Sequence, residues 1–143
     1  MPRTIVCGIL LCGLAALAGA CGSNSTPTTP TPTLVTETFS GSIALNGAVT
    51  QPFSTSTAGT VTATLTSVTP DTTVAIGFSV GTWNPTTSVC QIVMANDAAL
   101  QGAVLTGAAS TAGTYCLRMH DPGTGALTAD NTPISYTVTV SHP

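Results

Sequence analysis

Apolar and polar residues alternate with a period of two over most of the chain after about residue 34. The clearest run is at residues 61–66 (VTATLT), where apolar side chains and threonines would point to opposite faces of a strand. Threonine suits such a strand because its branched Cβ fits a pleated surface. The pattern is typical of antiparallel strands that have one face in the core and the other in water.

The alternation predicts about eight strands, near residues 35–45, 48–54, 60–68, 73–80, 89–94, 100–107, 113–120 and 133–141. Turn residues separate them. We expect Asn46 and Gly47 to close a hairpin between the first two strands, because both tolerate a positive φ. Pro52 has no N–H to donate and should lie on an edge strand. Residues 95–101 (ANDAALQ) are expected to hold at most one helical turn.

Eight short strands at this spacing predict an all-β domain over residues 34–143. The expected architecture is an antiparallel two-sheet sandwich of the jelly-roll type. About 110 residues are enough to bury a small core.

The first twenty residues differ from this domain. An apolar run (IVCGILLCGLAALAGA) occupies residues 5–20 and follows Arg3. It is shorter than the roughly 20 residues that a helix needs to cross a bilayer, and it ends in small residues. These features predict that residues 1–20 are a signal peptide.

The end of this run, residues 18–21 (AGAC), resembles the lipobox of bacterial lipoproteins. The third residue before the cysteine is usually Leu in that family and is Ala18 here. The resemblance implies cleavage before Cys21, a diacylglycerol on its sulfur and an acylated amino group. Several acyl chains anchor firmly, since each buried CH₂ contributes about 0.8 kcal/mol. It further implies a place in the bacterial cell envelope, at the outer membrane or cell surface. The alternative is ordinary secretion with a free thiol at Cys21.

Residues 21–33 contain the lipidated cysteine and a tether rich in Thr and Pro (SNSTPTTPTPT). Its prolines favour an extended chain, and it has few apolar groups to bury, so we expect a disordered spacer. Sugars on the threonines are an alternative.

Charged residues are scarce, and their balance excludes nucleic acids as partners. Without the leader, the chain has one base, Arg118, against five acids, a net charge of −4. Such a surface cannot neutralise phosphates, so we expect no nucleic-acid binding.

The cysteine count points to a disulfide. Two of the five cysteines lie in the leader and one is Cys21, which leaves Cys90 and Cys116 in the domain. An exported domain is oxidised, so we expect these two to pair. The alternative is a metal site with His120 and His142, but the spacing of zinc ligands is missing. We therefore expect no metal and no cofactor.

Four segments of the domain resemble the bacterial pre-peptidase C-terminal (PPC) type of β-sandwich. They are residues 39–43 (FSGSI), 58–65 (AGTVTATL), 112–118 (AGTYCLR) and 134–140 (ISYTVTV). The resemblance implies a non-catalytic module of the kind that accompanies secreted enzymes. Residues 50–53 (TQPF) keep only the Phe of the family's Asp-rich stretch, so an acidic site is not carried over.

Two motifs could carry catalysis, and both have simpler interpretations. Residues 77–81 (GFSVG) match G-x-S-x-G, but Ser79 lies inside an alternating strand with no helix after it. His120 and Asp121 are adjacent, and neighbours on a strand point to opposite faces, which argues against a dyad. His142 is close to the C-terminus and is expected to be mobile. We therefore expect no catalytic residues and no enzyme.

Two further features could bind a ligand. Asp121 and Asp130 bracket a loop whose oxygens could hold calcium, although Asp-Pro-Gly is first a turn signal. Trp83 is the candidate for stacking on a sugar, with packing at a sheet end as its alternative. The sequence thus predicts a membrane-anchored lipoprotein with a non-catalytic sandwich; a carbohydrate-binding module and a small secreted hydrolase are the alternatives. Its glycan or protein partner stays open.

Overall fold

The computed structural model describes residues 31–123 and 132–143. These residues form eight strands: β1 (Val35–Ile43), β2 (Ala48–Thr55), β3 (Gly59–Thr69), β4 (Ile76–Asn84), β5 (Val89–Ala99), β6 (Val104–Ala109), β7 (Gly113–His120) and β8 (Ile134–His142). Within the same residues there is no helix long and apolar enough to cross a membrane.

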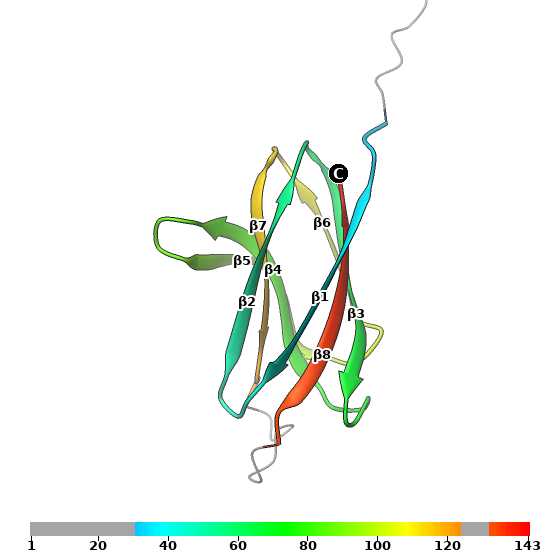
Figure 1. The fold of residues 1–143 in the computed structure, drawn as a ribbon, viewed down its shortest axis with the longest axis vertical. Helices are drawn as coiled ribbons and strands as arrows, with labels where there is room; N and C mark the ends of the chain where they lie inside the picture. Colours follow the sequence, from blue (N-terminus) through cyan, green and yellow to red (C-terminus); the bar gives the residue numbers. More distant parts are fainter. Residues whose placement is uncertain (1–30, 124–131) are drawn as a thin grey trace, which may run out of the picture. The chain divides into compact units, whose positions relative to one another are not determined.

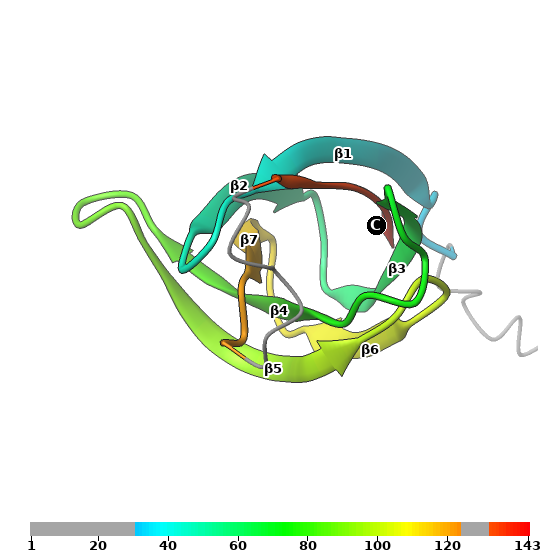
Figure 2. The same ribbon diagram turned by 90° about the horizontal axis from the view of Figure 1, so that it is seen from below.

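The strands form two four-stranded antiparallel sheets that face each other (Figures 1 and 2). One sheet has the order β1-β8-β3-β6 and the other β2-β7-β4-β5. The pairs are nested: the first strand pairs with the eighth, the second with the seventh, the third with the sixth and the fourth with the fifth. This is the order of a jelly roll, and it confirms the predicted all-β sandwich.

The turn at Asn46 and Gly47 joins the two sheets, so the predicted hairpin is wrong. The Gly47 N–H donates to the Ala44 carbonyl over 2.8 Å, and Asn46 has a positive φ of 57°. However, β1 pairs with β8 and β2 pairs with β7. The local turn chemistry was predicted correctly, but it reverses the chain between layers. Pro52 does lie on an edge strand, because β2 ends its sheet.

The single helical turn that was the most expected of residues 95–101 does not form, since β5 continues through Ala99. The segment keeps some turn character inside the strand: the Asn96 Oδ1 accepts from the Ala98 N–H over 3.0 Å. The register between β4 and β5 shifts at this point and again opposite Val80 and Gly81. Pairing with β4 therefore absorbs the local turn as a β-bulge.

The core consists of the apolar residues that the period-two pattern places on the inner faces. Its fully buried large side chains are Ile43, Leu65, Val68, Ile76, Phe78, Leu117, Met119, Val138 and Val140. Val61, Ala63 and Leu65 all lie inward, as the VTATLT pattern predicts. Burial of each such aliphatic side chain stabilises the fold by about 1.5–3 kcal/mol.

Tyr136 makes a polar link between the sheets. Its hydroxyl accepts from Gln51 Nε2 of β2 over 3.1 Å, and the same amide donates to the Ser40 carbonyl of β1 over 3.2 Å. Gly41 makes room for the ring, because a Cβ there would lie 2.6 Å from the Tyr136 hydroxyl. Burial raises the pKa of the Tyr136 phenol above its ordinary value, and the Gln51 hydrogen bond offsets part of this shift.

Candidate functional site

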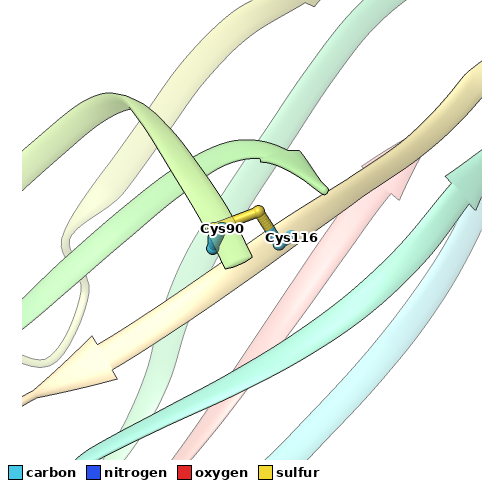
Figure 3. Close-up of a disulfide and its surroundings, with 2 residues drawn as sticks. All are labelled: Cys90 and Cys116. Carbon is cyan, nitrogen blue, oxygen red and sulfur yellow. A yellow bond between two sulfur atoms is a disulfide. The ribbon is translucent and has the colours of Figure 1, made fainter. Parts of the chain in front are cut away.

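The predicted disulfide between Cys90 and Cys116 is present. It joins the start of β5 to the middle of β7, with a Cα–Cα distance of 5.8 Å (Figure 3). These two strands are not neighbours, because β4 lies between them in the sheet. The bond therefore ties β5 to β7 across β4, one register pair from the loop end of the β4–β5 hairpin, whose tip projects from the sheets (Figures 1 and 2).

Gly81 makes this arrangement possible. A Cβ at Gly81 would overlap the Gln91 carbonyl and come within 2.9 Å of the Ile92 Cα. Both obstacles are backbone atoms of β5, so they cannot move aside as a flexible side chain would. A glycine in a strand interior often marks such a close approach of another backbone. Here it lets β5 cross close enough to β7 for the two sulfurs to bond.

Trp83 lies beside the bridge. It is paired in register with Cys90, and its side chain is partly buried. The other aromatic contacts form a separate group, in which Phe53 is tilted against Phe39 and stacked on Tyr115. Trp83 therefore does not belong to that group, and its role as a sugar platform stays a prediction.

Ser79 lies within β4, as predicted, and not at a strand-to-helix turn. Ile76, Phe78 and Val80 point into the core, so Ser79 points to the outer face of the sheet. It is nevertheless only 1% exposed. A nucleophile needs access to its substrate, so this geometry does not favour catalysis at Ser79.

His120 and Asp121 do not contact each other through their side chains. The His120 Nε2 lies 3.4 Å from Asp97 Oδ1 of β5. The Asp121 carboxylate instead accepts from the backbone N–H groups of Asn46, over 2.8 Å, and Gly123, over 3.0 Å. Asp121 is thus a turn residue, as its Asp-Pro-Gly context indicates.

The pair of His120 and Asp97 was missed by sequence reasoning. The imidazole crosses β4 over Gly77, where a Cβ would overlap the ring. The His120 Nδ1 is buried and has no hydrogen-bond partner among the described residues. Gly77, a glycine within a strand, was the one signal of this close approach.

The prediction that His142 is mobile is wrong. It is the last residue of β8, is paired with Val35 and is 2% exposed. Its Nε2 lies 3.1 Å from Glu37 Oε1, and its ring centroid is 5.4 Å from that of Phe53. The period-two phase of β8 explains this placement, since residues 134, 136, 138, 140 and 142 share the inner face.

The metal predictions depend on clusters of ligating residues. Across residues 31–123 and 132–143, no group of three or more His, Cys, Asp or Glu side chains could hold a metal ion. The calcium alternative concerned the loop between Asp121 and Asp130. Residues 124–131 of that loop lie outside the described residues, so this alternative stays a prediction.

A half-open apolar cavity of about 260 Å³ lies where the edges of the two sheets meet. Its walls come from β3, β4, β5, β6 and β7, and they include Val61, Val80, Val93, Met94 and Tyr115. No motif predicted it, because its lining comes from residues of five strands that belong to two different sheets.

The chain matches no model of a known protein family and no curated protein. The resemblances to the lipobox and to the PPC type of sandwich therefore stay predictions from the residues that carry them.

Proposed function

We propose that the chain is an exported lipoprotein, anchored in the bacterial envelope through Cys21, that presents a non-catalytic β-sandwich as a binding module. The observation that carries the proposal is the bond between Cys90 and Cys116, because disulfides persist in oxidising compartments outside the cytosol. Export agrees with the apolar leader, and the lipobox-like sequence supplies the acylation site.

The intact mass of the protein purified from membranes tests the proposal. A chain that begins at Cys21, carries added acyl mass and gains two hydrogens on reduction would support both the anchor and export. The matched control is Cys21→Ser, which should lose the acyl mass but keep the disulfide. An unmodified soluble parent chain would refute the anchor.

The non-catalytic part of the proposal rests on the burial of Ser79 and on the separation of His120 from Asp121 described above. An active-site serine probe should leave the folded chain unlabelled. Labelling of the parent chain that disappears in Ser79→Ala would refute this part and favour a hydrolase.

A carbohydrate-binding module is the second candidate. It is favoured by Trp83, which is partly exposed on the projecting hairpin. Trp83→Ala should then abolish retention on a glycan column without changing the thermal midpoint. Val89→Ala, at an apolar position 51% exposed on the same hairpin, is the control. Loss of the fold in Trp83→Ala would instead support a packing role.

A further inference from the structure

The cavity at the meeting edges of the two sheets has the properties of a small-ligand site. Its inner end consists of core residues: Val61 is 4% exposed, Val80 is 5% exposed and Ala109 is 2% exposed. Its outer rim contains Val93, which is 71% exposed. The cavity therefore runs from an apolar rim in water to the hydrophobic core.

The lining excludes a charged ligand. It contains no Asp, Glu, Lys, Arg or His side chain. Its one titratable side chain, Tyr115, donates its hydroxyl to the Thr111 carbonyl over 3.0 Å, so that group is already engaged. Thr82 and Ser110 supply the remaining hydroxyls. A buried charge without a partner would cost several kcal/mol here, so the occupant must be neutral and largely apolar.

One wall can adapt to an occupant. Met94 lies against Gly107, where a Cβ would be 2.5 Å from the Met94 Cε. Methionine is unbranched and flexible, and it is well suited to surfaces that repack around different ligands. The glycine leaves the thioether free to fill or to vacate this part of the cavity.

The size of the cavity sets the size of the occupant. An apolar cavity of about 150 Å³ holds one benzene, or roughly 25 Å³ per carbon, so about 260 Å³ corresponds to roughly ten carbons. We propose that this cavity binds the alkyl chain of a free neutral amphiphile, with about ten carbons inside and the polar head outside Val93. The proposal deepens the binding function above, on which it rests, by naming the ligand class.

The test uses the mature chain, residues 21–143, carrying Cys21→Ser, which keeps the apolar leader, acyl chains and detergent away from the measurement. Straight-chain alcohols from hexan-1-ol to tetradecan-1-ol are titrated against the protein labelled with ¹³C at its methionine methyls. The Met94 methyl resonance should shift and saturate, whereas that of Met119, which is buried in the core away from the cavity, should stay in place. Affinity should rise about fourfold per methylene up to about ten carbons and then level off.

Ala108 provides the blocking variant, because it lines the cavity at an exposed position on β6. Ala108→Trp should weaken decan-1-ol binding at least tenfold, and Ala108→Leu serves in its place if the larger residue prevents folding. The control is Ala48→Trp, at an exposed position on β2 outside the lining, and it should bind as the parent does. The proposal is overturned by a Met94 signal that does not saturate, by affinity that keeps rising to fourteen carbons, or by equal binding in the blocked variant. The mass measurement on Cys21 is independent of these outcomes, so the anchor and the cavity can fail separately.

Discussion

Removing the disulfide should cost the domain a large part of its stability. Cys90 and Cys116 are 26 residues apart, and closing a loop of this length lowers the entropy of the unfolded chain by an amount worth about 3.5 kcal/mol at 25 °C. Domains of this size are stable by only about 5–15 kcal/mol in total. The double variant Cys90→Ala/Cys116→Ala should therefore lower the free energy of unfolding by about 3–4 kcal/mol and Tm by roughly 10–20 °C.

Urea unfolding followed by the fluorescence of Trp83, the single tryptophan of the chain, measures this loss. The reduced parent chain is the control, because it loses the cross-link but keeps both sulfur atoms. Cys116 is fully buried, so the alanine variant should be less stable than the reduced chain by a further small packing cost. A loss below about 1 kcal/mol in both proteins would refute the assignment of this stability to the closed loop.

Three other changes test the packing and the polar link. Gly81→Ala should destabilise the fold by more than about 2 kcal/mol in urea unfolding, because the new Cβ meets the backbone of β5. The control is Gly113→Ala, which has open space around it and should change stability by less than about 0.5 kcal/mol. Equal effects of the two variants would contradict the close approach of β5 to Gly81. Leu65→Ala, at a position with no exposure, should cost about 2–5 kcal/mol in the same assay, and a cost under 1 kcal/mol would place Leu65 outside the core. The pKa of Tyr136 is raised above its unfolded value of 10.0, so the unfolded chain ionises first as the pH rises. The contribution of Tyr136 to the free energy of unfolding should therefore be fully present below pH 10 and be lost as the pH rises through the folded pKa. Tyr136→Phe should flatten this fall in melting curves measured from pH 9 to 12, and an unchanged slope would assign it to other groups.

Much of the fold could be predicted, because the alternation of apolar and polar residues within a segment is enough to identify it as a strand. The alternation at residues 61–66 places Val61, Ala63 and Leu65 in the core without knowledge of their partners. The alternation does not show which strands pair with one another. Asn46 and Gly47 specify a reversal of the chain, but burial of the inner faces decides that β1 and β2 enter different sheets. Asn96 favours a local turn, and the ladder with β4 overrides it.

The candidate site was less predictable, because most of it depends on contacts between distant strands. The disulfide could be predicted by elimination, since two cysteines remained in a domain that the apolar leader predicts to be exported. The pair of His120 and Asp97 required the order β5-β4-β7, which no local signal contains. The cavity depends on how the edges of the two sheets meet. It also depends on the contact between Gly107 and Met94, which lie on different strands, so Gly107 could not be recognised as part of the cavity from the sequence.

The nested pairing also determines when the first sheet can form during folding. Residue 35 is paired with residue 142, and β8 lies between β1 and β3. A chain that ends before Ile134 therefore lacks the strand that holds the first one in place, and β1 has no neighbour to pair with. Folding of such nonlocal topologies is slow, because distant segments must meet before their contacts are formed. The sheet β1-β8-β3-β6 can form completely only when β8 is present. The domain therefore reaches its native fold only after the chain through β8 is available to fold.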